Sequence, residues 1–397
     1  MFFPSVDTQP QLDTLPKCGQ CGRAKMCFSP RVTQQGKGKR NILFIRNSPT
    51  GSEDGTGRFF TDEEGQELRD ILDDMGENLE NCWYAYAVAC HGPRYPQSKD
   101  ILACRPQLNR IIQACNPAVI VLLGGDAVES VIGVEWGRSI GFADRWVGWT
   151  IPSQFRKAWL CPTYSIGELL RDKDTTIRKR LITQHIKTAF RLLKKPCPVF
   201  PDMNQEVELI HRPRLGIKRM KGLLSAKGRL AWDIETNCLK PETTGSRIYT
   251  CSFCLNGEDT FACPITNESM PMLSRVLRTK GLRKIASNLK FEDRWIRNKL
   301  GHRVVNWWWD TMIAAHVLDN RPGITSLKFQ SYVHFGIGDY EAAVAHLLKT
   351  TGEDGLNSIH RIHAADLLLY NAKDSLLEYR LAMRQRRLMK KLKESFV

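Results

Sequence analysis

The sequence of 397 residues lacks any apolar run long enough to span a bilayer. Its start, MFFPSVDTQP, has neither the basic segment nor the apolar core of a secretory signal peptide. It also has no internal repeat and no low-complexity tract. These absences predict a cytoplasmic protein with no membrane association, and the length favours two or three domains over one.

Acidic residues are also scarce: 42 Asp and Glu stand against 58 Lys and Arg, a formal charge of +16. A basic excess of this size favours a polyanionic partner such as nucleic acid, because Lys and Arg that neutralise phosphates release counterions. The sequence has 13 cysteines, an odd number, and it has no secretory signal. They argue against a disulfide scaffold and for metal ligands together with buried thiols.

Strand-like and helical segments alternate in the first half, which predicts an α/β domain with a parallel sheet. Strands are expected at 41–46, 81–90 and 158–165, and helices at 63–76 and 176–195. The stretch 116–133 is expected to form a strand, a Gly turn and a helix. The Pro-rich stretch PCPVFPDMNQ (196–205) is the best linker candidate. It predicts two domains, 1–200 and 201–397. The second shows strands near 206–210, 229–234, 247–254 and 259–263, followed by helices.

The stretch RLAWDIETN places two acids, Asp233 and Glu235, at the end of an apolar strand. Side chains two apart on a strand face the same way, so both carboxylates project together. Further acids follow in NLKFE (Glu292) and WDTM (Asp310), and YNAKD puts Tyr370 and Asp374 on one helical face.

Carboxylates that converge from a strand and from helices suit a pair of Mg²⁺ or Mn²⁺ ions, which prefer hard oxygen ligands. Two such ions can activate a water and stabilise the leaving oxygen of a phosphodiester. A tyrosine hydroxyl one helical turn from a ligand could orient that water. A set of surface salt bridges is the alternative explanation of these acids.

These motifs, over residues 205–395, resemble the DnaQ-like 3′–5′ exonucleases of the tyrosine (DEDDy) subclass, as in the proofreading domain of A-family DNA polymerases. The resemblance implies an RNase H-like fold with a mixed sheet. It implies that Asp233, Glu235 and Asp374 are metal ligands and that Tyr370 positions the water. It also implies DNA contacts by Leu239, which would wedge between the terminal bases, and by Asn288 and Lys290. Asn288 is in addition a candidate N-cap.

One position departs from that family. The second motif usually ends in Asp, but this sequence has Glu292, which is one methylene longer and keeps the charge. We expect Glu292 to serve as a ligand directly or through water, with Asp293 and Asp310 as fallbacks.

CGQCG supplies Cys18 and Cys21, and ACHGPRYPQSKDILACRP supplies Cys90 and Cys104. Grouped thiolates suit an iron–sulfur cluster or zinc. This spacing, with GKGKRNILFIRNSPTG and GRFFTDEEGQELRDIL, resembles the family 4 iron–sulfur uracil-DNA glycosylases over residues 15–195. The resemblance implies a [4Fe–4S] cluster on these four cysteines, with Cys27 as a substitute ligand.

The glycosylase positions depart from that family. Asn47 stands where a Glu is usual, Tyr86 where an Asn reads uracil, and Cys161 where a His stabilises the leaving base. A thiol is a weak hydrogen-bond donor. Phe60 keeps its expected place, where it could stack on a base. Because all three polar groups are changed, we expect an inactive scaffold that binds DNA or another protein.

A second CxxC, Cys251 and Cys254, lies on a predicted strand, which favours buried thiols; zinc with Cys238 and Cys263 is the alternative. Two basic stretches, 211–222 and 384–393, either line a DNA path or form solvated helix faces. The three tryptophans at 307–309 favour core packing over base stacking.

Together these features predict a 3′–5′ DNA exonuclease with a glycosylase-like iron–sulfur domain. Since no polymerase domains follow the third motif, we expect a stand-alone proofreading subunit that acts on single-stranded 3′ ends beside a separate DNA polymerase, in a bacterium or a phage-infected bacterium. Three alternatives stay open: a bifunctional glycosylase and exonuclease, a non-catalytic binding module, and an RNA-trimming relative.

Overall fold

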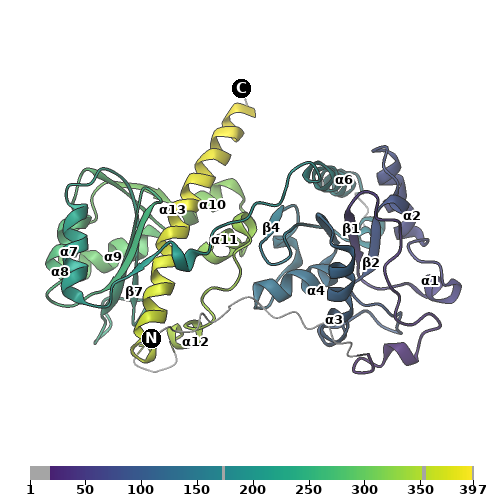
Figure 1. Cartoon of the computed structure of the whole chain (residues 1–397), viewed down its shortest axis with the longest axis horizontal. Helices are drawn as coiled ribbons and strands as arrows, with labels where there is room; N and C mark the ends of the chain where they lie inside the picture. Colours follow the sequence, from purple (N-terminus) through teal and green to yellow (C-terminus); the bar gives the residue numbers. More distant parts are fainter. Residues whose placement is uncertain (1–17, 172–174, 351–354, 396–397) are drawn as a thin grey trace. The chain divides into compact units, whose positions relative to one another are not determined.

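The computed structural model describes residues 18–171, 175–350 and 355–395. The chain divides into two compact α/β units (Figure 1). The first extends to Phe200 and also takes in Tyr332–Asp339; the second holds Pro201–Ser331 and the chain from Tyr340 on. Within the described residues, no helix combines the length and apolar character needed to cross a membrane.

The first unit is built on a five-stranded sheet in the order β2-β1-β3-β5-β4. All of its strands pair in parallel except β4, which lies antiparallel to β5 at one edge. Every residue of β1 and β3 is buried, as expected of central parallel strands covered by helices on both faces. The predicted parallel α/β sheet is therefore confirmed. The strands are β1 (Ile42–Arg46), β2 (Trp83–Tyr86), β3 (Val119–Leu123), β4 (Ile151–Ser153) and β5 (Ala158–Thr163).

The predicted helices of this unit correspond to α2, α4 and α6, whereas α1, α3 and α5 were not predicted. Helix α2 begins after Asp62, whose side chain accepts a hydrogen bond from the Gly65 N–H and so caps it. Helix α3 was not predicted, because Pro106 interrupts its pattern. The helices are α1 (Gly51–Thr56), α2 (Glu63–Asp73), α3 (Ser98–Cys115), α4 (Gly125–Trp136), α5 (Ile166–Arg171) and α6 (Thr175–Leu192).

The second unit has a six-stranded mixed sheet in the order β11-β10-β7-β8-β9-β6. Strands β11, β10 and β7 are parallel, β7, β8 and β9 form an antiparallel meander, and β6 joins β9 in parallel. The predicted mixed sheet is confirmed. The strands are β6 (Glu208–Leu209), β7 (Gly228–Thr236), β8 (Ile248–Leu255), β9 (Asp259–Pro264), β10 (Leu282–Ala286) and β11 (Trp307–Asp310).

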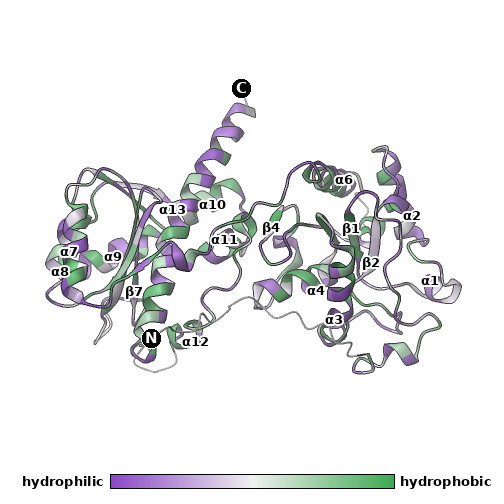
Figure 2. Cartoon of the chain, in the orientation of Figure 1, coloured by the Kyte–Doolittle hydropathy of each residue, from purple (hydrophilic) through white to green (hydrophobic). Residues whose placement is uncertain are grey.

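Helices cover both faces of this sheet. A core that includes Leu230, Trp232 and Ile234 packs against α7, α8 and α9. On the other face the long helix α13 contacts β7, β8 and β9 (Figure 1), and its C-terminal end is hydrophilic (Figure 2). The helices are α7 (Pro213–Leu223), α8 (Met270–Leu277), α9 (Leu289–Leu300), α10 (Thr311–Leu318), α11 (Leu327–Phe335), α12 (Ala345–Leu348) and α13 (Ala364–Ser395).

Strand β7 decides where the acids point. Trp232 and Ile234 enter the core on the α7–α9 side. Because side chains alternate along a strand, Asp233 and Glu235 face the opposite side, where α13 lies. The apolar residues of RLAWDIETN thus orient its two carboxylates.

Candidate active site

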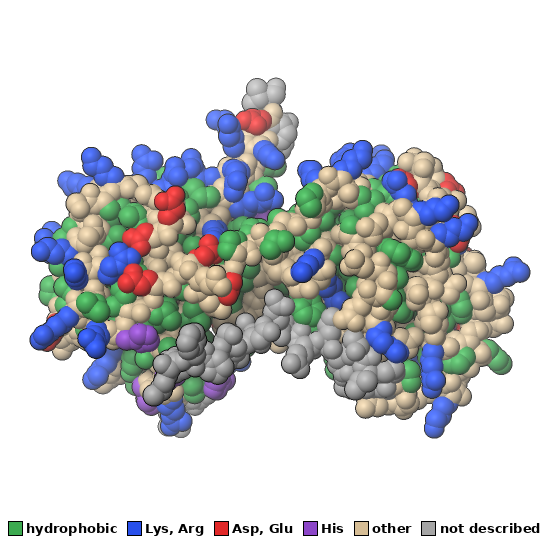
Figure 3. All heavy atoms as spheres, viewed as in Figure 1, with side chains coloured by type: hydrophobic (Ala, Val, Ile, Leu, Met, Phe, Trp, Pro, Cys, Tyr) green, Lys and Arg blue, Asp and Glu red, His purple; other side chains and the backbone are tan. Residues whose placement is uncertain are grey.

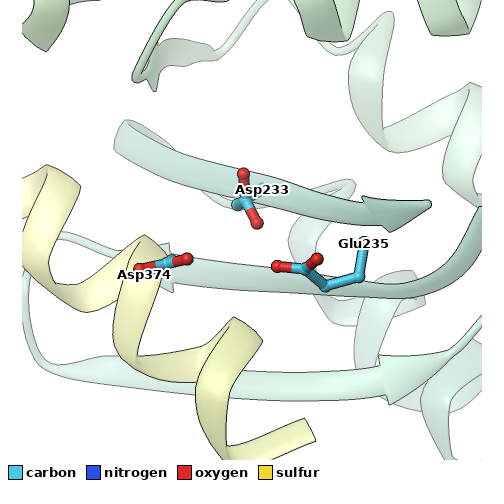
Figure 4. A group of neighbouring side chains, drawn as sticks. All are labelled: Asp233, Glu235 and Asp374. Carbon is cyan, nitrogen blue, oxygen red and sulfur yellow. The ribbon is translucent and has the colours of Figure 1, made fainter. Parts of the chain in front are cut away.

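Three predicted ligands meet between β7 and α13. Carboxylate oxygens of Asp233, Glu235 and Asp374 all lie within 4.8 Å of one another. Figure 4 shows the side chains converging, two from the sheet and Asp374 from the yellow helix α13. Such a cluster of oxygens can hold a divalent cation, and the chemistry of the donors fits Mg²⁺ or Mn²⁺.

The electrostatics of this cluster favour a cation. Burial and the neighbouring Asp374 carboxylate raise the pKa of Asp233 to about 8. Burial and the charge of Asp233 likewise raise the pKa of Glu235 well above its ordinary value. Mutual repulsion in a dry site makes the ionised forms costly unless a positive charge joins them. A divalent ion would relieve that cost.

Two more buried acids, Glu292 and Glu378, accompany the triad. Glu292, on α9, is 1% exposed, and its Oε2 has no hydrogen-bond partner. Burial, followed by the charge of Asp233, raises its pKa well above the usual range. Glu378, one helical turn after Asp374, accepts a 2.9 Å hydrogen bond from the Ser287 N–H. Glu378 was not predicted from the sequence, although its spacing of four residues from Asp374 on a helix was a usable signal.

Asp310 has a different task from the predicted one. Its carboxylate accepts the backbone N–H groups of Asn288 and Leu289 at 3.2 and 3.0 Å. It also accepts those of Met312 and Ile313 at 2.9 and 3.1 Å. Asp310 therefore caps α9 and α10 together, so we assign it to capping rather than to metal binding.

The cap of α9 also corrects the expectation for Asn288. Asn288 occupies the N-cap position with a left-handed backbone, φ 69°, but its side chain makes no capping hydrogen bond. Asp310 provides that bond from β11 instead. The other fallback, Asp293, accepts the Val304 N–H at 3.1 Å and so ties down the loop after α9.

Tyr370 lies beside the triad, but a lysine engages its hydroxyl. Tyr370 is 7% exposed, and the Lys328 ammonium donates to its Oη at 2.7 Å. The same ammonium lies 3.1 Å from Asp374. Tyr340 donates a short hydrogen bond to Asp374 as well. Lys328 and Tyr340 were missed, because their distance from the motifs in sequence gives no local signal.

The predicted DNA contacts lie at the surface. Leu239, in the segment after β7, is 74% exposed and is therefore accessible to a bound strand. Lys290 is also exposed, whereas Asn288 is half-buried. Their contacts with DNA stay predictions.

In the first unit, the four predicted cluster cysteines are electrostatic neighbours. Burial raises the pKa of Cys104 to about 12, and the charges of Cys90, Cys21 and Cys18 add to it. The Arg31 N–H donates to Cys90 Sγ and the Ala89 N–H to Cys104 Sγ, each at 3.2 Å. A soft sulfur set with backbone donors fits an iron–sulfur cluster.

Cys27 belongs to the same sulfur group. Burial and the charge of Cys90 raise its pKa to about 11, and its side chain hydrogen-bonds Cys90. Cys27 therefore stays a candidate ligand beside the four predicted ones.

The glycosylase-like pocket is filled by protein side chains. Phe60 is fully buried, and the rings of Tyr84 and Tyr86 each lie 4.9 Å from its own. The Arg46 guanidinium covers it at 4.9 Å. A base could stack on Phe60 only if Arg46 or Tyr86 moved.

Arg46 is held by ion pairs in this pocket. It contacts Glu53 at 2.9 Å and Asp62 at 2.7 Å, and it is 2% exposed. Burial by itself would raise the pKa of Asp62. The hydrogen bond from Arg46 and the charge of Arg46 act against burial, and the pKa of Asp62 lies below its ordinary value. Of the other two altered positions, Cys161 is 3% exposed and Asn47 is half-buried with an unpartnered Oδ1.

The alternative of a zinc site in the second half is not supported by geometry. Cys251 and Cys263 pair across β8 and β9 and lie in the core. Cys254, three further along β8, points to the opposite face. Within 18–171, 175–350 and 355–395, these sulfurs do not form a group of three or more ligand atoms that lie within 4.8 Å of one another. These cysteines are buried thiols.

Comparison with known families agrees with both halves of this description. Residues 33–194 match the uracil DNA glycosylase superfamily, and residues 216–392 match the family described as 3′–5′ exonuclease, the DNA polymerase A exonuclease model. Type-4 uracil-DNA glycosylase of Thermotoga maritima is 29% identical over 41% of this chain and 83% of its own length. That of Saccharolobus solfataricus is 32% identical over 28% of this chain. The chain spans about half (53%) of the length of that archaeal relative.

Solved structures resemble the second half only distantly. The catalytic core of RRP6 from Trypanosoma brucei has a TM-score of 0.37 at 16% identity, covering 49% of this chain and 51% of its own. Escherichia coli RNase D has a TM-score of 0.37 at 14% identity, covering 47% and 45%. The assignment therefore rests on the family models: the chain joins a domain of the uracil-DNA glycosylase superfamily to a 3′–5′ exonuclease domain.

Proposed function

We propose that this protein is a divalent-metal-dependent exonuclease that removes nucleotides from the 3′ ends of DNA. The observation that carries the proposal is the convergence of Asp233, Glu235 and Asp374 within 4.8 Å beside Tyr370. These three carboxylates, with Glu292 behind them, would hold Mg²⁺ or Mn²⁺. Ions held there would supply Lewis acidity and a water of lowered pKa.

The chain's own residues supply the rest of the chemistry. Tyr370, as in the DEDDy subclass, orients the attacking water through its hydroxyl. Exposed Leu239 separates the terminal base from its neighbour, and Lys290 contacts the phosphate backbone. DNA is favoured over RNA because the first domain matches a superfamily whose curated relatives are named for uracil-DNA.

The charge of the protein supports a nucleic-acid substrate. Lys and Arg exceed Asp and Glu by 58 to 42. On the face drawn in Figure 3, their side chains spread over both units, while Asp and Glu are few. The basic stretch 384–393 forms the hydrophilic end of α13 (Figure 2). Such a surface attracts phosphates over long range and in a salt-dependent manner.

A digestion assay tests the activity. We expect the wild-type chain with Mg²⁺ to shorten 5′-labelled single-stranded DNA from its 3′ end, and Asp374→Asn to be at least about 100-fold slower. Lys299→Met, a change in the same unit away from the carboxylates, is the matched control. Digestion by Asp374→Asn at the wild-type rate, or none by either protein, would contradict the proposal. Preference for a matching RNA would favour the RNA-trimming alternative.

We further propose that the protein proofreads for a separately encoded DNA polymerase in a bacterial or phage-infected cell. The support is the family of its exonuclease domain, which is named for the A-type DNA polymerases. Co-purification with a polymerase encoded beside it, and a lower error rate of that polymerase when the wild-type chain is added, are the expected results. If the wild-type chain neither associates with that polymerase nor lowers its error rate, this role is wrong.

For the first domain we propose a [4Fe–4S] cluster on Cys18, Cys21, Cys90 and Cys104 and no uracil excision. The filled pocket around Phe60 supports the second point. The superfamily match favours the rival, a bifunctional repair enzyme. A uracil-containing duplex treated with Asp233→Ala and then with alkali separates them, because cleavage at the abasic site would establish the rival.

A further inference from the structure

Lys328, the second residue of α11, brings a positive charge into the carboxylate site. Its Nζ lies 3.1 Å from one oxygen of Asp374 and 3.4 Å from the other. It also lies 2.7 Å from the Tyr370 hydroxyl. The side chain is 20% exposed, so water reaches it only partly.

The ammonium is held on several sides. The rings of Tyr370 and Tyr340 lie 4.8 and 5.6 Å from Nζ, close enough for cation–π attraction. Glu341 approaches to 3.5 Å. Burial by itself would lower the pKa of Lys328, but the charges of Asp374, Glu341 and Glu235 raise it above its ordinary value. Lys328 therefore has acids and aromatic rings on several sides.

Asp374 is both a partner of Lys328 and a candidate metal ligand. In the structure its oxygens accept hydrogen bonds from Lys328 and Tyr340. The same carboxylate is one of the three that converge within 4.8 Å as candidate metal ligands. An ammonium and a divalent cation on one carboxylate repel each other strongly in a site with little water.

We propose that Lys328 is a positioning residue that neutralises Asp374 in the metal-free protein and competes with a divalent ion for that carboxylate. This inference rests on the proposed exonuclease function. Glu341 is the acceptor to which Lys328 turns when it leaves Asp374, since it already lies within 3.5 Å. The partner of Lys328 therefore depends on whether a metal ion is bound: Asp374 without the ion, and Glu341 with it.

Calorimetric titration of the full chain with Mn²⁺ tests the proposal. We expect Lys328→Met to bind Mn²⁺ about tenfold more tightly than wild type, a coupling of ordinary size for two sites that exclude each other. Lys328→Arg should return the affinity to near the wild-type value, because it restores the charge. In EDTA, Lys328→Met should melt a few degrees below wild type, since Asp374 loses its partner. Lys280→Met, at an exposed lysine of the same unit, is the control and should change neither value.

The outcomes separate this inference from the proposed function. Unchanged or weaker Mn²⁺ binding by Lys328→Met, in a protein whose wild type binds Mn²⁺ and whose Asp374→Asn variant does not, would overturn the role of Lys328 alone. No Mn²⁺ binding by the wild-type chain would overturn the metal site and this inference with it. If Lys328→Met does not fold, Lys328→Gln replaces it with the same expected tightening.

Discussion

Asn371 donates a 2.7 Å hydrogen bond from its Nδ2 to the Asp233 carboxylate. Asn371 is fully buried on α13, three residues before Asp374, whereas Asp233 lies on β7. This bond joins the first and third motifs across 138 positions of sequence. It also aims one carboxylate of the triad at the other two.

Replacement of Asn371 should therefore weaken metal binding without removing a ligand. For Asn371→Ala we expect Mn²⁺ affinity to fall by about 10-fold to 100-fold, as for other groups that orient ligands. Calorimetric titration measures it. Asn298→Ala, an exposed-helix amide of α9 in the same unit, is the control, and unchanged affinity in Asn371→Ala would show that Asp233 needs no such support.

Glu292 stands where the exonuclease family usually has Asp, so its charge can be tested separately from its reach. We expect Glu292→Gln to slow digestion at least about 10-fold, because a buried carboxylate facing Asp233 is lost. Glu292→Asp should retain more activity than Glu292→Gln. Equal rates for wild type and Glu292→Gln in the single-strand assay would remove Glu292 from the site.

Four of the five cysteines in the first-unit group are expected to bind iron. We expect about four iron atoms per chain in anaerobically purified protein, lost in Cys21→Ser and retained in Cys27→Ser. Iron analysis and visible absorbance check both variants. The reverse pattern would make Cys27 the ligand in place of Cys21, which the contact between Cys27 and Cys90 leaves open.

Arg46 should be essential for the stability of the first unit. Removing it in Arg46→Met leaves Glu53 and Asp62 without their buried partner, so we expect a loss of about 3–5 kcal/mol. Arg69→Met breaks the more exposed pair with Glu80 and should cost less than about 1 kcal/mol. Urea unfolding monitored by hydrogen exchange in β1 measures both, and similar losses would contradict the account.

Lys284 should destabilise the second unit in a pH-dependent way. It is fully buried on β10, and burial lowers its pKa to about 8. The pKa of Lys284 in the folded chain lies below the unfolded value of 10.5. The free-energy cost of burying the charged ammonium is therefore complete below pH 8 and decreases between pH 8 and 10.5.

We therefore expect Lys284→Met to be about 2 kcal/mol more stable than wild type at pH 7, with the difference shrinking towards pH 10. Thermal unfolding at several pH values tests this. A constant difference across that range would show that the ammonium is not the cause. Lys280→Met, in the turn before β10, provides the control.

The sequence by itself determined most of the strands of both units and the direction of the main acids. Apolar runs such as ILFIR and VIVLL specified buried parallel strands. Alternation in β7 put Asp233 and Glu235 on one face, and helical spacing put Tyr370 and Asp374 on one side of α13. These features follow from backbone periodicity, which neighbouring residues encode.

Only the tertiary structure decided how distant segments use their side chains. In the folded chain, Asp310 accepts hydrogen bonds from the N-termini of two helices and is not part of the triad. The tertiary structure also set Lys328 against Asp374, 46 positions away, and it filled the pocket around Phe60 with Arg46 and Tyr86. The physical reason is that a carboxylate, an ammonium or a ring takes the partner that packing brings within reach, and no local periodicity records that partner.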